Sequence, residues 1–347
     1  MKFLIFGGPG IGDTIIELTL AKGLKIHYPG AEVDLIVSNS LGAINVLNDL
    51  LDCQDYIDNC FFYTKKELLK TGLLFLKLRY RKFDYGFFCT TSFKAKNTAS
   101  KICRFLGCKS VIKEIKGKTG HIDIPVSIPE NIHIVQQYEC LFNELCPQQK
   151  LDIEVLNTKY LEGLVNFNSE GRKIITICLG SNITIYKRDG KTFHKNIKEW
   201  DISNWCELAN TLVEKGYKIV FIGGKKEREA LKHTDVQLNK LVDTSYLGKA
   251  TVKESISILS LSELVIGADT GMMHCAAALG KKTLSLFGGT PADVWRPYSP
   301  YNVVIIGDTD CSPCYGKDYA INCVERKCMK KIRCEKVLEC VDGILGD

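Results

Sequence analysis

The sequence predicts an α/β protein built from two Rossmann-like domains, with parallel sheets facing a central cleft. Short apolar runs alternate with helical patterns, and the alternation restarts after a polar stretch near the middle of the chain. Several of the apolar runs end in glycine turns. The length of 347 residues suits two domains of ordinary size. We expect ligands at the carboxyl ends of the strands, where the glycine turns fall.

The first half of the chain opens with a strand, a tight loop and a helix. Lys2–Phe6 is an apolar run that ends in glycines, and a helical pattern follows from Thr14. Further strands are predicted at Val33–Val37, Phe83–Phe88 and Lys109–Ile115. These elements predict an N-terminal domain over residues 1–160.

A polar segment, NFNSEGRK, marks a linker that we place at residues 161–172. The second domain is predicted over residues 173–332, and a C-terminal helix over 333–347 could pack back on the first domain. Its predicted elements are the strands Ile174–Leu179, Lys218–Ile222, Leu264–Ile266 and Thr283–Phe287, and a helix from Ile202 to Lys215.

Composition excludes several classes of protein. A net charge of +6, from 46 basic and 40 acidic residues, is too mild to indicate nucleic-acid binding. No apolar run approaches the roughly 20 residues of a membrane span. Glycine appears after only six residues, too early for the apolar core of a signal peptide. We therefore expect a cytoplasmic protein, which could still rest on a membrane surface.

The loop after the first strand reads GGPGIGDT, from Gly7 to Thr14. The spacing of its outer glycines fits a phosphate-binding P-loop, but Asp13 stands where that loop needs lysine, and a carboxylate there would repel phosphates. The dinucleotide fingerprint G-x-G-x-x-G is absent as well. Two interpretations of Asp13 stay open: an ordinary first-turn helix residue, or a general base kept ionised by the helix N-terminus.

A second candidate site follows the predicted strand at 264–266, where Asp269, Thr270 and Gly271 lead into a helix. Backbone N–H groups at that helix start could bind a diphosphate, and Asp269 could accept hydrogen bonds from sugar hydroxyls. His274 lies about one turn further along. It could contact the same ligand, or it could be a buried histidine packed on the sheet.

Three more polar residues lie close to predicted strand ends or helix starts. Lys198 could pair with a diphosphate, Ser181 could donate to a phosphate, and Glu227 could hold a ribose. Each of them alone also fits an ordinary surface residue. Together they lie where a single nucleotide could contact all three.

Two basic regions of the first domain have open interpretations. Lys94, Lys96, Lys101 and Arg104 could pair with an acidic sugar of an acceptor, or could form a solvated helix face. The segment Lys65–Lys82 is both basic and apolar, so it could lie on an anionic membrane or be a plain surface helix.

Six of the 16 cysteines cluster near the C-terminus, and the other ten are expected to be small buried hydrophobic residues. Cys311, Cys314, Cys323 and Cys328 form a C-x2-C-x8-C-x4-C pattern, which could bind structural zinc. The alternative is a set of reduced thiols that stabilise a loop, as a reducing compartment favours.

Taken together, these motifs make the chain resemble glycosyltransferase family 9, the bacterial heptosyltransferases of lipopolysaccharide core synthesis. The resemblance spans nearly the whole chain. It is carried by Ile11-Gly12-Asp13, Lys198-x-Trp200, Asp269-Thr270-Gly271-x-Met273-His274, Phe287-Gly288-Gly289-Thr290-Pro291 and Cys311-Ser312-Pro313-Cys314. The chain departs from the family pattern at Gly7–Gly10, at Met272 and in the lysine-rich Tyr186–Asn196, which leaves the identity of the donor open.

The resemblance implies a GT-B fold and an inverting, metal-independent transfer of a sugar, with heptose from ADP-heptose favoured. It implies that Asp13 is the base and that Lys198 meets the donor phosphate. Donor binding would involve Gly12, Ser181, Lys198, Glu227, Asp269, Thr270, Gly271 and His274. A lipid-linked or oligosaccharide acceptor would bind the first domain, and the protein could touch the cytoplasmic face of the inner membrane. No cofactor is expected apart from the zinc considered above.

Three alternatives remain. The same fold could use a UDP- or GDP-linked sugar, or it could bind a nucleotide-sugar without transferring it. The joint presence of Asp13, Lys198 and His274 favours transfer over simple binding. An NAD-dependent oxidoreductase is disfavoured by the spacing of the glycines.

Overall fold

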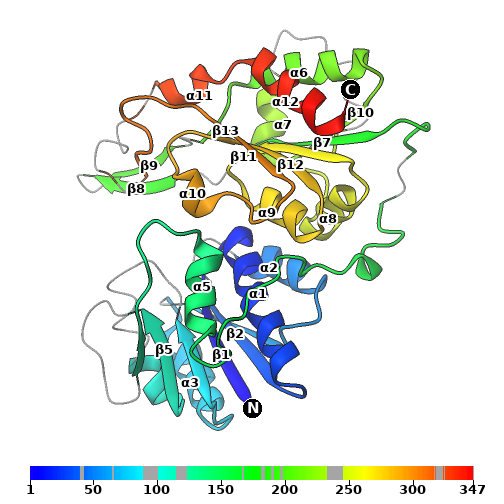
Figure 1. Cartoon of the computed structure of the whole chain (residues 1–347). Coiled ribbons are helices and arrows are strands. Elements are labelled where there is room, and N and C mark those ends of the chain that lie inside the picture. The colour runs from blue at the N-terminus through cyan, green and yellow to red at the C-terminus, as the bar shows by residue number, and fades with distance from the viewer. Residues whose placement is uncertain are drawn as a thin grey trace. The chain divides into compact units, whose positions relative to one another are not determined.

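The computed structural model divides into two compact units, Met1–Asn157 and Thr158–Asp347 (Figure 1). The structure describes residues 1–39, 43–64, 66–88, 101–114, 123–165, 168–180, 184–188, 191–195, 198–232, 245–315, 317, 323 and 325–346.

The first unit is a parallel sheet covered by helices, and the described strands lie in the order β3-β2-β1-β4-β5-β6. Its strands are β1 (Lys2–Gly7), β2 (Glu32–Ser38), β3 (Asn59–Tyr63), β4 (Tyr85–Phe88), β5 (Ser110–Glu114) and β6 (Asp123–Val126). Its helices are α1 (Ile11–His27), α2 (Ala43–Leu51), α3 (Leu68–Arg79) and α5 (Ile134–Phe142).

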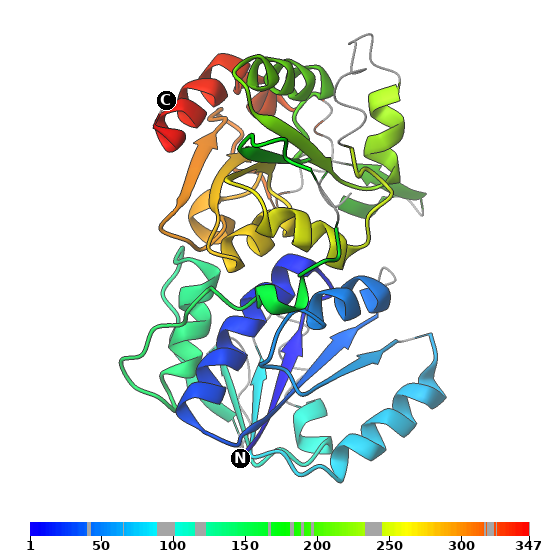
Figure 2. The same cartoon turned by 90° about the vertical axis from the view of Figure 1, so that its right-hand side faces the viewer.

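Strand β1 is apolar from Phe3 to Phe6, where it is buried on both faces, as central strands of parallel sheets are. Phe3 points to the side of α1, where its ring lies 5.4 Å from that of Tyr28 at the end of the helix. Leu4 and Phe6 point the other way and pack in one cluster with Leu78 of α3. Helices α1 and α3 therefore cover opposite faces of the sheet, and Figure 2 shows α3 in light blue at the rim of this unit.

The second unit contains another parallel sheet, with its described strands in the order β10-β7-β11-β12-β13. Its strands are β7 (Ile174–Cys178), β10 (Lys218–Ile222), β11 (Leu264–Ala268), β12 (Lys282–Phe287) and β13 (Asn302–Ile306). Its helices are α6 (Ile202–Glu214), α7 (Lys225–Lys232), α8 (Val252–Ser260), α9 (Gly271–Ala278), α10 (Ala292–Trp295), α11 (Lys327–Lys331) and α12 (Cys334–Leu345). The lysine-rich part of this unit contains the antiparallel pair β8 (Thr184–Arg188) and β9 (Lys191–Lys195).

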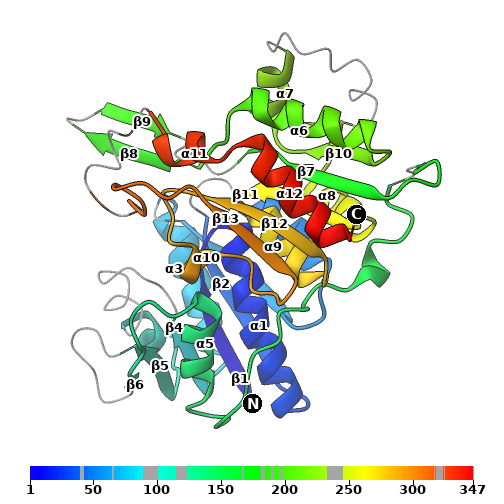
Figure 3. The ribbon, with the colours of Figure 1, turned by 45° about the horizontal axis from the view of Figure 1, so that its top comes forward.

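Two tryptophans hold one side of the second core together. Trp200 and Trp205 meet edge to face at 4.7 Å, and Nε1 of Trp200 donates to the carbonyl of Ile332 at 2.9 Å. Val337 and Val341 of α12 are fully buried in the same cluster. The C-terminal helix is thus part of the core of the second unit, beside α6 and β12 (Figure 3).

The structure confirms the alternating α/β pattern and each of the strands predicted above. Strands β3, β6, β8, β9 and β13 were not predicted. The described part of the chain has no helix that is both long and apolar enough to cross a membrane.

Candidate functional site

The glycine loop of the first unit folds over the carboxylate of Asp13. Gly10 is the N-terminal cap of α1, and its N–H donates to Oδ2 of Asp13 at 3.2 Å. A Cβ atom added at Gly8 or Gly10 would lie 2.6 or 2.8 Å from the same oxygen, so a side chain at either position would displace Asp13. An ordinary carboxylate in the first turn of a helix accepts the same hydrogen bond from its cap residue. The contact is therefore compatible with both interpretations of Asp13.

Glu17 lies one turn beyond Asp13 and is fully enclosed, with 1% of its surface exposed. Its Oε1 accepts a hydrogen bond from the N–H of Gly8 at 2.7 Å. Burial raises the pKa of Glu17 well above its ordinary range, the negative charge of Asp13 raises it further, and the Gly8 N–H offsets part of this shift. Burial and the neighbouring charge of Asp13 therefore favour the protonated form of Glu17.

Glu17 was not predicted from the sequence. Its only signal there is a second acidic residue four positions after Asp13, in the mostly apolar first half of the predicted helix. In the structure it ties the start of the loop to the first turns of α1, beside the candidate base.

In the second unit, the turn from β11 to α9 holds an ion pair. Asp269 follows the strand, Thr270 is the extended cap residue, and α9 begins at Gly271. Nζ of Lys198 lies 2.6 Å from Oδ2 of Asp269, and these side chains are 21% and 10% exposed. A cation, a carboxylate and the amino end of a helix thus meet at the carboxyl end of β11.

His274 is buried in the second turn of α9, as the packing interpretation of its sequence position predicts. Burial lowers its pKa to about 4, and the charge of Lys198 adds to this, while the charge of Asp269 acts in the opposite direction. His274 is therefore neutral at pH 7. Because the charges of Lys198 and Asp269 both act on its pKa, His274 lies close to this ion pair.

Glu227 lies in the first turn of α7 at the neighbouring strand ends. Its Oε2 accepts from the N–H of Gly224 at 2.9 Å. A Cβ atom on Gly180, which follows β7 with a φ of +91°, would lie 2.6 Å from Oε1 of Glu227. Burial raises the pKa of Glu199, and the charge of Glu227 contributes, so the segment carrying Lys198 passes near this carboxylate. The ends of β7, β10 and β11 therefore bring together Lys198, Glu227 and Asp269.

Tyr315 is a further neighbour that was not predicted. The N–H of Tyr315 donates to the carbonyl of Gly289, just beyond β12, at 2.8 Å. Its ring lies 5.9 Å from Nζ of Lys198 and is half exposed. An aromatic ring beside the lysine adds a surface on which a flat or cationic group can pack.

Several predicted site residues have no described surroundings. Ser181, Lys94 and Lys96 lie outside the described residues. Lys101 and Arg104 are exposed in the first unit, which agrees with a solvated basic face and leaves acceptor binding untested.

The C-terminal cysteines come near each other. Cys314 and Cys328 are buried, and burial raises the pKa of both thiols, with the charges of Cys311 and Cys323 adding to the effect. The N–H of Cys314 donates to the carbonyl of Gly289, so this cluster packs against the turn after β12. Within the described ranges, no three His, Cys, Asp or Glu side chains are arranged to hold a metal ion. A zinc site here remains a prediction.

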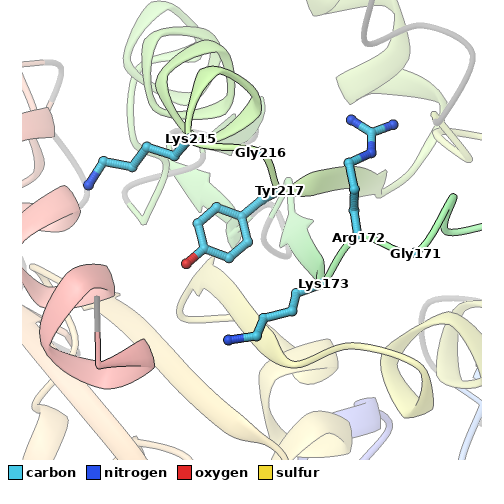
Figure 4. Close-up of a pocket in the computed structure, with 6 residues that line it drawn as sticks. All are labelled: Gly171, Arg172, Lys173, Lys215, Gly216 and Tyr217. Carbon is cyan, nitrogen blue, oxygen red and sulfur yellow. The ribbon is translucent and has the colours of Figure 1, made fainter.

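A surface pocket of about 540 Å³ lies elsewhere in the second unit (Figure 4). Its lining includes Arg172, Lys173 and Lys215, at the amino ends of β7 and β10. Arg172 pairs with Glu170 at 2.6 Å, and Lys215 pairs with Asp342 at 2.5 Å. This pocket lies at the edge of the sheet opposite the candidate site, and two of its cations already have carboxylate partners.

The protein has the GT-B fold, with two parallel α/β units, and its candidate site residues lie at strand ends. The chain belongs to glycosyltransferase family 9 (heptosyltransferase), whose sequence profile matches residues 121–325. It is 28% identical over 355 residues to lipooligosaccharide heptosyltransferase 2 of Campylobacter jejuni, covering 99% of this chain and 98% of that protein.

Two solved structures share the fold of the whole chain. The E. coli ADP-heptose lps heptosyltransferase II superposes with a TM-score of 0.72 at 19% identity, covering 99% of this chain and 98% of the other. The E. coli heptosyltransferase WaaC with ADP gives a TM-score of 0.67 at 15% identity, covering 99% and 100%. Membership of the family agrees with the resemblance noted in the sequence.

Proposed function

We propose that this protein transfers heptose from ADP-heptose to a lipopolysaccharide-core or related surface-glycan acceptor, in the cytoplasm, with inversion at the anomeric carbon and without a metal. The relatives described above are heptosyltransferases of lipopolysaccharide or lipooligosaccharide, which supports this choice of substrates. The observation that carries the proposal is the pair of Lys198 and Asp269 at the start of α9.

The leaving nucleoside diphosphate gains negative charge as the bond to the sugar breaks. In the proposed reaction, Lys198 and the N–H groups at the start of α9 stabilise that charge, so no metal ion is required. When the diphosphate binds, Lys198 pairs with it, either in place of Asp269 or in addition to it. Asp269 then accepts hydrogen bonds from the sugar. His274 stays neutral beside them, which avoids a second cation in the buried part of the site.

Asp13 is the proposed general base. One carboxylate oxygen is fixed by the Gly10 N–H, and the helix N-terminus favours the ionised form. An acceptor hydroxyl held beside it would pass its proton to Asp13 as the oxygen attacks the sugar. Gly12, Ser181 and Glu227 are proposed donor contacts, and Lys94, Lys96 and Arg104 are proposed acceptor contacts.

The test is to incubate the purified protein with ADP-heptose and a heptose-acceptor core oligosaccharide and to analyse the products by mass spectrometry and NMR. We expect a product one heptose heavier, with the anomeric configuration inverted, in the presence of a chelator. Transfer only from UDP- or GDP-sugars would replace the donor assignment. Tight ADP-heptose binding without transfer would favour the non-catalytic alternative.

A further inference from the structure

Helix α3 is apolar on two opposite faces. Its inner face packs on the first sheet, where Leu78 is buried and Leu74 and Phe75 are half-buried in the cluster around Leu4 and Phe6. A surface helix normally needs only one such face. Among the described residues of this unit, the second apolar face of α3 takes no part in the packing of the core.

The outer face is a stripe of four large side chains, Leu69, Leu73, Leu76 and Tyr80, which we name the α3 stripe. The intervals of four, three and four residues place them in one row along the helix. Their exposed fractions are 86%, 62%, 47% and 81%. Soluble proteins rarely expose a contiguous apolar row of this kind unless it binds something.

The stripe has cations on both flanks. Lys70 and Lys77 lie along one side of the α3 stripe, and Arg79 lies along the other side. The guanidinium of Arg79 packs over the ring of Phe105 at 5.5 Å, and Nη1 donates to the Phe105 carbonyl at 2.7 Å. This contact fixes one cation at the edge of the row.

Acidic residues are scarce in the same segment. Residues 66–82 contain six lysines and arginines and a single acidic residue, Glu67, which pairs with Lys70 at 3.1 Å. Arg81 turns inward to Asp34 of the sheet, so it does not contribute to the outer surface. The outer face of α3 is thus apolar at its centre and positive at its borders.

We propose that the α3 stripe docks the first unit on an anionic lipid bilayer. The helix would lie parallel to the membrane plane, with the leucines at the level of the acyl chains and the lysines and arginine at the headgroup phosphates. The positive border identifies the occupant, since a second copy of this chain would bring the same charges against it. Docking does not require the proposed transfer; its value for a lipid-linked acceptor rests on that proposed function.

The test is co-sedimentation of the full chain with vesicles. We expect binding to phosphatidylcholine vesicles that contain phosphatidylglycerol, little binding to phosphatidylcholine alone, and release at high salt. The variant Leu69→Ser/Leu73→Ser/Leu76→Ser should weaken binding at least about tenfold, because most of the apolar insertion is lost. Lys70→Glu/Lys77→Glu should weaken it by roughly fivefold or more for each charge.

A matched control removes as many exposed apolar side chains elsewhere: Ile26→Ser/Leu164→Ser/Leu261→Ser, whose residues are 60%, 39% and 48% exposed. This variant should bind vesicles like the unmodified protein. Circular dichroism and thermal unfolding check that each variant is folded. ADP binding separates this proposal from the proposed function, since a chain that binds ADP-heptose and not vesicles refutes only the docking. Equal vesicle binding by the stripe variant and the control would overturn the proposal. So would a stripe variant that changes the oligomeric state of the protein but not its vesicle binding.

Discussion

Replacing His274 by glutamine should remove a pH dependence from the stability of the second unit. The neutral imidazole is favoured in the folded protein, because burial lowers its pKa from 6.5 to about 4. The unfolded chain binds the proton more readily, so acidification favours unfolding. The stabilising contribution is complete above about pH 6.5 and is lost progressively as the pH falls toward 4.

The size of this effect follows from the shift. A lowering of roughly 2.5 units, at about 1.4 kcal/mol for each unit, amounts to about 3 kcal/mol of unfolding free energy between neutral pH and pH 4. Acidic groups such as Glu199, whose pKa burial raises, titrate in the opposite direction. They are common to both proteins, so the difference between the protein and His274→Gln isolates the histidine.

The assay is urea unfolding followed by tryptophan fluorescence at a series of pH values. All three tryptophans, Trp200, Trp205 and Trp295, lie in the second unit, so the signal reports on that unit. The difference in unfolding free energy between the unmodified protein and His274→Gln should decrease by about 3 kcal/mol from pH 7.5 to pH 4. Parallel curves, or an NMR titration of the His274 ring with a pKa near 6.5, would refute the reasoning.

Two further substitutions test the sites. Lys198→Ala should weaken ADP binding by roughly ten- to a hundredfold in calorimetry, since a charged hydrogen bond to phosphate is lost; unchanged affinity in both Lys198→Ala and Lys198→Ala/Asp269→Asn would remove Lys198 from the site. Glu17→Gln should gain stability relative to the unmodified protein as the pH rises, because the amide does not ionise and its oxygen still accepts from the Gly8 N–H. The unmodified protein should lose stability relative to the variant as the pH rises above the ordinary carboxyl pKa and through the raised folded-state pKa of Glu17. Hydrogen exchange of α1 at a series of pH values measures this, and a stability difference that does not change with pH would contradict the assignment.

Much of the fold could be predicted because the central strands are continuous apolar runs that end in glycine. The mostly apolar run at 174–178, with Gly180 two residues beyond it, and the run at 264–268, with Gly271 three residues beyond it, are of this kind. The strands that were missed lie at or near sheet edges: β6 contains Pro125, and β13 is only partly buried, so their patterns are weaker.

The candidate site was predictable where a residue follows a strand directly, as Asp269 does. It was not predictable where the position depends on tertiary packing. The burial of Glu17 depends on the sheet beneath α1, and the approach of Tyr315 to Lys198 depends on a hydrogen bond to Gly289. The outer face of α3 was not predictable either, because the sequence does not show which of its leucines are packed on the sheet and which are exposed.

Single-turnover transfer by Asp13→Asn tests the central claim most directly. Asparagine keeps the shape of the side chain and its acceptor oxygen for the Gly10 N–H, but it cannot take up a proton. With ADP-heptose bound as tightly as before, we predict that transfer slows by about 10²- to 10⁴-fold. Transfer at the rate of the unmodified protein would contradict the account.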